Sequence, residues 1–174
     1  MGPVWVVDSN CFIHLGQKAE DGFIEDLQAV LRGRQLLITP GVEQEVATVA
    51  LRRCEGRPNL LKALDSMLHS VPVDEDDVRS LAQRIGESAA PQDVDLSLMV
   101  LADGLGAESS DVVLVSDDFK MTTTADRTDL RFETCPPSTF LQRWVADAPD
   151  ASRDARFRSL SRQVRAAEMK YAIS

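Results

Sequence analysis

Short runs of consecutive hydrophobic residues punctuate the sequence. Three of them are Val4–Val7, Leu36–Ile38 and Val112–Val115. Unbroken apolar runs of this length are typical of strands buried on both faces, as in a parallel sheet. Leu130–Phe132 fits a fourth strand, and Val71–Val73 fits at most a short edge segment. The chain is therefore expected to build its core around a small sheet.

The segments between these runs repeat apolar residues at spacings of three and four, which predicts helices with one buried face. We expect Thr39 to cap a helix that starts at Pro40, and Asp74 to cap another. The apolar positions of the expected helices are Phe23 to Leu31, Val42 to Val49, Leu60 to Leu68, Val78 to Ile85, Leu98 to Leu105 and Phe140 to Trp144. Alternating strands and helices predict an α/β fold, a three-layer α/β/α sandwich with a central, mostly parallel sheet.

The last part of the chain is expected to form a C-terminal helical tail. Its apolar residues Phe157, Leu160, Val164, Ala167 and Tyr171 recur at helical spacing, and it is net positive. We therefore divide the chain into residues 1–148, the main domain, and 149–174, a basic amphipathic tail. The periodicity favours a helix packed on the body or on a second copy, so a homodimer is expected. The alternative is an RNA-binding arm that uses Arg158, Arg162 and Arg165.

Composition narrows the class of protein. A net charge of −9 argues against a globally basic nucleic-acid-binding domain, but an acidic metal site is compatible with it. The three cysteines, Cys11, Cys54 and Cys135, are too scattered for a zinc site and are expected in the core. No apolar run reaches the roughly 20 residues of a membrane helix, and the first residues lack a basic leader. We expect a cytoplasmic protein with no membrane partner.

Acidic residues follow the predicted strands. Asp8 ends the first strand, and Asp117 and Asp118 follow the strand at Val112–Val115. Sites in parallel sheets gather beyond the carboxyl ends of the strands. Although a single strand-end aspartate is usually a turn residue, several acids directed to the same edge of one sheet indicate a site.

Helical phase selects two further acids. Asp95 shares a face with Leu98, Ala102 and Leu105, whereas Asp93 points roughly to the opposite side. An acid on an apolar face is costly to bury without a partner, so Asp95 is the functional candidate.

On the helix after Pro40, Glu45 flanks the stripe made by Val42 and Val46, and Glu43 lies further from it. We therefore prefer Glu45. Crowded carboxylates need cations to hold them together, and oxygen ligands suit Mg²⁺ or Mn²⁺. Asp8, Glu45, Asp95 and Asp117 are the predicted cluster.

In order and spacing, four segments of the chain resemble the PIN-domain nucleases. The segments are Val6–Asn10, Ile38–Val46, Asp95–Ala107 and Val115–Phe119, and the resemblance extends over residues 4–146. Ser116–Met121 is similar to the ribosome-maturation branch of that family, although this chain lacks the cysteine pairs of the branch's zinc ribbon. The VapC toxins of toxin–antitoxin pairs are the other branch and are usually shorter than this chain.

The resemblance implies a metal-dependent endoribonuclease that hydrolyses RNA to a 5′-phosphate and a 3′-hydroxyl. One or two Mg²⁺ or Mn²⁺ ions would be held by Asp8, Asp95 and Asp117, with Glu45 as a further ligand or a base for water. The supporting residues it implies are Ser9, Asn10 and Ser116, which position ligands or water, and Asp118, which supports or replaces Asp117. An antitoxin or a ribosomal partner is implied by one branch or the other.

Two alternative hypotheses about the function remain. A non-catalytic PIN-like module would bind RNA or a protein through acids that do not converge. A response-regulator receiver would share strand-end aspartates, but it would need adjacent acids at the first strand and a lysine after the last, and neither is found in the sequence.

Overall fold

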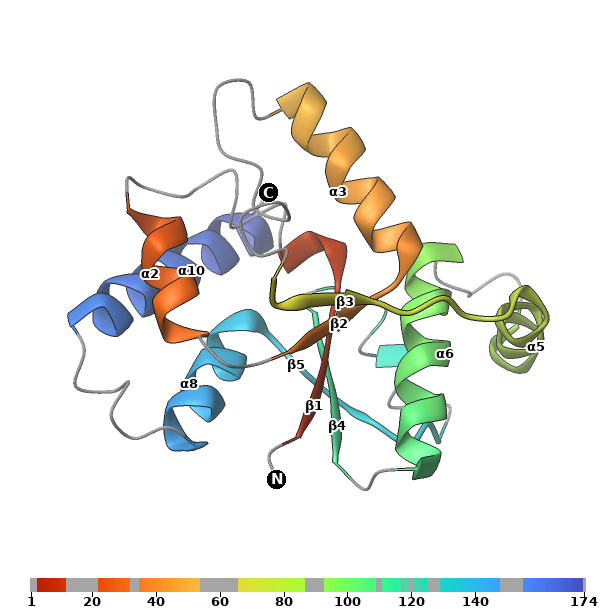
Figure 1. Cartoon of the computed structure of the whole chain (residues 1–174). Helices are drawn as coiled ribbons and strands as arrows, with labels where there is room; N and C mark the ends of the chain where they lie inside the picture. Colours follow the sequence, from red (N-terminus) through yellow and green to blue (C-terminus); the bar gives the residue numbers. More distant parts are fainter. Residues whose placement is uncertain are drawn as a thin grey trace.

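The computed structural model describes most of the chain (Figure 1). It covers residues 3–11, 22–31, 35–53, 66–86, 93–108, 111–116, 118, 121, 123–124, 129–147 and 155–173. The strands are β1 (Val4–Val7), β2 (Leu36–Ile38), β3 (Leu68–Ser70), β4 (Val112–Val115) and β5 (Glu133–Cys135). The helices are α2 (Phe23–Val30), α3 (Pro40–Arg53), α5 (Glu75–Ile85), α6 (Asp93–Glu108), α8 (Pro137–Asp147) and α10 (Ala155–Ile173).

The five strands form one sheet in the order β3-β2-β1-β4-β5, and every neighbouring pair is parallel. From β1 the chain adds β2 and β3 on one side, then returns to place β4 and β5 on the other. The strand order therefore reverses between β1 and β4, the position at which open α/β sheets form their ligand crevice. In flavodoxin-like sheets, the class of receiver domains, β1 lies between β2 and β3, so the topology argues against the receiver reading.

Helices lie on both faces of the sheet, as expected for the three-layer sandwich. In Figure 1, α2, α8 and α10 gather on one side, and α6 and α5 lie on the other. The strands that form the middle of the sheet, β1 and β4, are almost wholly apolar, and all four residues of β4 are buried. This burial explains why both strands read as continuous hydrophobic runs rather than alternating ones.

The predicted core cysteines are confirmed where the structure describes them. Cys11 and Cys135 are buried, and neither forms a disulfide with another described residue. Burial raises the pKa of the Cys135 thiol to about 12, so it packs as a neutral group. Cys54 lies outside the described residues.

The C-terminal segment is a helix, and α10 packs against α2 and α8. Leu160 and Val164 are fully buried in the same core as the sheet. The Glu168 carboxylate accepts hydrogen bonds from the Ser138 backbone N–H (2.6 Å) and hydroxyl (2.8 Å) at the start of α8. Packing on the body is therefore the observed arrangement of this helix, while the homodimer stays a prediction.

Three details of the sequence prediction are wrong. The last strand is Glu133–Cys135, directly after the predicted Leu130–Phe132. Leu68, expected at the end of a helix, begins β3, and the edge strand therefore precedes Val71–Val73. These errors arise because short segments with few apolar residues carry little periodic signal. The rest of that expected helix, residues 60–65, lies outside the described part.

None of the helices in the described ranges combines the length and the apolar character that a membrane span requires.

Candidate active site

The reversal of strand order places Asp8 and Ser116 side by side. Val7 pairs with Val115, and the next residue of each strand is Asp8 or Ser116. The Asp8 backbone N–H donates to the Val115 carbonyl (3.0 Å), which continues the ladder by one bond. The first side chains beyond the two central strands thus lie beside each other at the carboxyl end of the sheet.

The Asp8 side chain is completely buried. The Ser116 hydroxyl donates to its Oδ2 at 2.8 Å, and the Ser9 hydroxyl lies 3.3 Å from its Oδ1. These bonds fix the carboxylate against the end of the sheet. A buried polar group requires such partners, and hydroxyls supply them without adding charge.

Burial, followed by the nearby carboxylates of Asp95 and Asp118, raises the pKa of Asp8 from 3.8 to about 7. The hydrogen bonds from the Ser116 hydroxyl and the Ser9 backbone N–H act against this shift. Among the described residues, the groups that favour the charged form are thus hydrogen-bond donors rather than cations. A positively charged ligand would relieve both the burial and the repulsion.

Glu45 joins the site from α3. Its Oε1 accepts a 2.8 Å hydrogen bond from the Ser9 hydroxyl, the same group that faces Asp8. Glu43 is exposed, whereas Glu45 is half-buried. The sequence-based preference for Glu45 over Glu43 therefore agrees with the geometry.

Asp95 approaches Asp8 from the first turn of α6. It is half-buried and close enough to raise the pKa of Asp8. Leu98 and Ala102, which share its predicted face, are fully buried. However, Leu96 and Met99 are also buried, so α6 lies in the core over a wider arc than one stripe.

The residues after β4 are only partly described. Asp117, a predicted metal ligand, lies outside the described residues. The Asp118 backbone N–H donates to the Ser116 hydroxyl (3.0 Å), and its Oδ1 accepts from the Met121 backbone N–H (3.2 Å). Asp118 thus stabilises the turn after the strand, which suits a supporting residue.

The remaining predicted residues lie at two places. Asn10 is half-buried in the helical turn that follows Asp8. Arg158, Arg162 and Arg165 are exposed on α10, so their side chains are available for contacts with a partner.

A hard divalent cation suits the chemistry of these donors, because they are carboxylate and hydroxyl oxygens. Asp8, Asp95 and Glu45 could hold such an ion. In the described ranges, however, no three Asp, Glu, His or Cys side chains are grouped closely enough to hold one metal together. The donors therefore match Mg²⁺ or Mn²⁺ in kind, but their spacing among the described residues is not that of a closed metal site.

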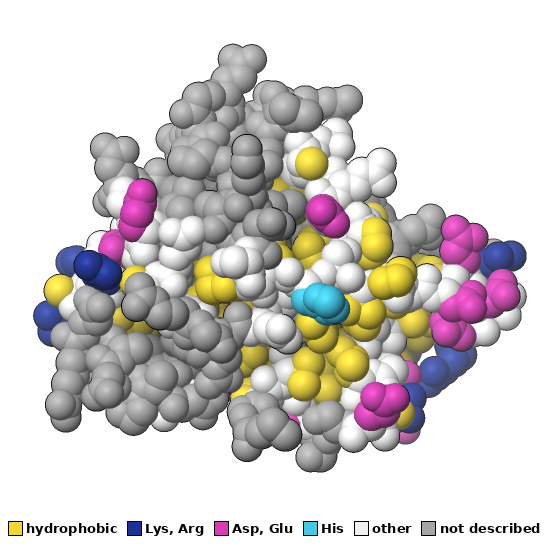
Figure 2. Space-filling view, in the orientation of Figure 1, with side chains coloured by type: hydrophobic (Ala, Val, Ile, Leu, Met, Phe, Trp, Pro, Cys, Tyr) yellow, Lys and Arg dark blue, Asp and Glu magenta, His cyan; other side chains and the backbone are white. Residues whose placement is uncertain are grey.

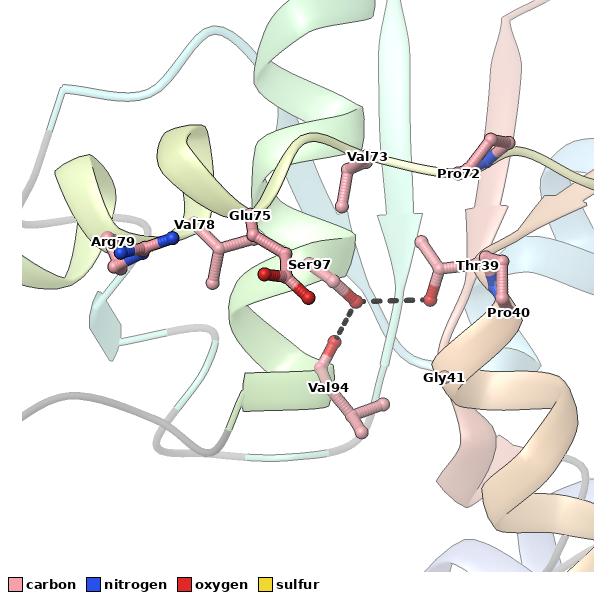
Figure 3. A pocket seen from close by; sticks show the side chains of 10 residues that line it. All are labelled: Thr39, Pro40, Gly41, Pro72, Val73, Glu75, Val78, Arg79, Val94 and Ser97. Atoms are coloured by element: carbon pink, nitrogen blue, oxygen red, sulfur yellow. Dashed lines mark hydrogen bonds between the residues drawn. The ribbon is translucent and has the colours of Figure 1, made fainter.

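A pocket beside the carboxylates was not predicted from the sequence. Its volume is about 540 Å³, and it lies between the ends of β2 and β3 and helices α5 and α6 (Figure 3). Its lining residues are Thr39, Pro40, Gly41, Pro72, Val73, Glu75, Val78, Arg79, Val94 and Ser97. In Figure 2, hydrophobic side chains gather over β3 and the segment that leads to α5. The one signal in the sequence was Thr39, a polar residue at a strand end like Asp8.

Comparison with known proteins found no family model that matches this chain and no curated protein that matches it.

Proposed function

We propose that the protein is a metal-dependent endoribonuclease whose active site is the carboxylate cluster of Asp8, Glu45, Asp95 and Asp117. The observation that carries the proposal is the buried Asp8 carboxylate at the reversal of strand order, whose pKa is raised by burial and by nearby acids. Functional acids are often found in such an environment, buried and near further carboxylates. The resemblance to PIN-domain nucleases supplies the reaction.

In this proposal Asp8, Asp95 and Asp117 hold one or two Mg²⁺ or Mn²⁺ ions. A bound ion lowers the pKa of water and neutralises charge on the phosphate. Glu45 is a further ligand or accepts a proton from the attacking water.

Ser9 and Ser116 are positioning residues. Ser9 contacts both Asp8 and Glu45, and Ser116 contacts Asp8 and the Asp118 N–H. Ser116 donates its one proton to Asp8 and accepts from Asp118, and Ser9 donates to Glu45 at 2.8 Å beside Asp8, which holds these acids in a fixed relation.

A second candidate is a non-catalytic PIN-like module that binds RNA or protein. The observation that favours it is the lack, among described side chains, of three acids close enough to hold one ion. The two hypotheses differ in the role of Asp117, because the nuclease requires its carboxylate to complete the cluster.

Cleavage of a labelled, structured RNA in Mn²⁺ tests the proposal. We expect wild-type protein to cut the RNA, EDTA to stop it, and Asp8→Asn or Asp95→Asn to reduce the rate by more than the roughly 10–100-fold that loss of an outer partner costs. Asp77→Asn is the matched control, since it makes the same change at an exposed position of α5. Equal rates in all four proteins would refute the assigned site.

A further inference from the structure

We propose that the pocket defined above is a nucleobase subsite, which binds a base of the RNA next to the cleaved phosphate and prefers bases that carry an amino group. This inference rests on the proposed function, because the phosphate is taken to lie at the carboxylate cluster.

The pocket and the cluster are neighbours along one edge of the sheet. β1 and β2 are adjacent and parallel, with Val6 opposite Leu37. Two residues further along, Asp8 and Thr39 stand at the same level, one strand spacing of about 4.8 Å apart in the sheet. On α6, Asp95 belongs to the cluster and Ser97, two residues later, lines the pocket. A nucleotide with its phosphate at the cluster can therefore reach the pocket with its base.

The walls of the pocket suit a flat, largely apolar ligand. Pro40, Pro72, Val73, Val78 and Val94 line it with aliphatic surface. A volume of about 540 Å³ lies within the roughly 300–1,000 Å³ range of small-molecule sites. It offers room for a base and part of its ribose, and the faces of the base would pack on these side chains.

The directions of two hydrogen bonds decide which atoms Thr39 can offer a ligand. The Ser97 hydroxyl donates to the Val94 carbonyl at 2.6 Å, which uses its one proton. The Thr39 hydroxyl, 3.1 Å from the Ser97 oxygen, must therefore be the donor of that pair (Figure 3). With its proton used, Thr39 can offer a ligand only its oxygen lone pairs.

The rim adds a second acceptor. Figure 3 shows the Glu75 carboxylate extending from the first turn of α5 toward α6. Arg79, also on the rim, is bridged to Asp76 at 3.1 Å. Thr39 and Glu75 thus offer the ligand hydrogen-bond acceptors, which select N–H donors, while Arg79 keeps N–H groups that its contact with Asp76 leaves for acceptor atoms of the same ligand.

This chemistry favours a base over a phosphate. The lining carries one carboxylate, Glu75, and one guanidinium, Arg79, so it has no net positive charge to attract a phosphate. The phosphate is therefore directed to the proposed metal-binding cluster and the base to the pocket. Adenine, cytosine and guanine each carry an exocyclic amino group, whereas uracil offers only a ring N–H. We therefore expect amino-bearing bases to bind more tightly than uracil.

Titration with the four nucleoside 5′-monophosphates, followed by NMR of the valine methyl groups, tests the inference without requiring cleavage. We expect the Val73, Val78 and Val94 signals to shift, and at least one amino-bearing nucleotide to bind about tenfold more tightly than UMP, as for a hydrogen bond to a charged group. Glu75→Gln should reduce this preference. Because Glu75 is exposed, the variant should fold normally.

A pair of bulky substitutions provides the matched control. Val78→Trp fills the pocket and should abolish binding, whereas Gln83→Trp places the same side chain at an exposed position of the same helix and should leave binding intact. Equal affinity for all four nucleotides, no binding to wild type, or binding that survives Val78→Trp would overturn the inference.

The two proposals fail in different ways. RNA cleavage in Mn²⁺ without nucleotide binding in the pocket would leave the nuclease standing and remove the subsite. Base-selective binding in the pocket, with no cleavage of any RNA by wild type, would leave the subsite standing and remove the nuclease.

Discussion

The carboxylate cluster and the neighbouring pocket lie on the same edge of the sheet but are built in different ways. The cluster centres on Asp8, whose side chain is inaccessible to solvent and is fixed by hydroxyl groups. The pocket is open and is lined mainly by residues of helices and of the segment after β3. Two of its polar groups, the Thr39 and Ser97 hydroxyls, pair with each other.

The difference separates two tasks. Strand ends are fixed by the ladder, so they can hold an acid where its charge is unfavourable. Helix and loop residues tolerate a wider choice of side chain, so they can shape a surface for selection. We therefore expect substitutions at the cluster to change stability in a way that depends on charge and pH. At the pocket we expect ligand binding to depend on shape.

The largest expected effect on stability concerns the charge of Asp8. Its pKa rises from 3.8 to about 7 on folding, so ionisation opposes folding. The penalty is absent below about pH 3.8, grows between 3.8 and about 7, and stays constant above that. In EDTA, Asp8→Asn should be more stable than wild type at pH 8, by on the order of a few kcal/mol, and the gain should shrink at pH 5.

Urea unfolding at the two pH values measures this gain. Asp77→Asn should unfold like wild type at both, because its carboxylate is exposed. If Asp8→Asn were less stable than wild type at pH 8, the charged Asp8 carboxylate would have to be stabilised by a favourable interaction that outweighs its burial.

Close packing of α6 should affect both regions, because this helix carries Asp95 and Ser97. A Cβ on Gly106 would overlap the Arg131 carbonyl oxygen and lie 2.7 Å from the Arg131 Cβ. Gly106→Ala should therefore destabilise the protein by about 1–3 kcal/mol. Gly104→Ala, with nothing within 4 Å of the new Cβ, should stabilise it by about 0.5–1 kcal/mol. Thermal unfolding of the two variants measures both changes. If both variants were stabilised, or both destabilised, the packing of α6 against Arg131 described here would be wrong.

Two serines sharpen the comparison directly. Ser116→Ala removes a donor to the Asp8 carboxylate, so it should cost about 1–3 kcal/mol at pH 8 and less at pH 5, where Asp8 is protonated. Ser97→Ala removes hydrogen bonds between neutral groups and should cost about 0.5–1.5 kcal/mol at both pH values. Denaturant unfolding at the two pH values gives both costs. The same pH dependence in both variants would remove the distinction between the regions.

The smallest effect is expected at the exposed arginines of α10. If Arg158, Arg162 and Arg165 contact phosphates, each change to Ala should weaken RNA binding modestly and reduce the slope of log affinity against log salt by about 0.7–0.9. Arg156→Ala is the control on the same helix, because Arg156 lies 4.0 Å from Asp26. An unchanged slope in the triple variant would confine the role of α10 to packing.

Much of this architecture was predictable because burial and strand direction leave clear marks in the sequence. The runs at Val4–Val7 and Val112–Val115 identified the centre of the sheet. The acids that follow them marked the edge at which we propose the active site. β3 and β5 were misplaced, since an edge strand such as Leu68–Ser70 has few buried residues to reveal it.

The site was less predictable than the fold. Helical phase selected Glu45 and Asp95, but it gave no sign that Ser9 connects Glu45 to Asp8. The pocket brings together residues from four separate segments, and such a meeting depends on tertiary packing that no local pattern records.

A titration with Mn²⁺, with the free ion followed by electron paramagnetic resonance, tests most directly whether the acids at this edge hold a metal. Wild type and Asp77→Asn should bind the ion equally, while Asp8→Asn and Asp95→Asn should bind at least about 100-fold more weakly. Equal binding by all four proteins, or no binding by wild type, would contradict the carboxylate cluster as a metal site.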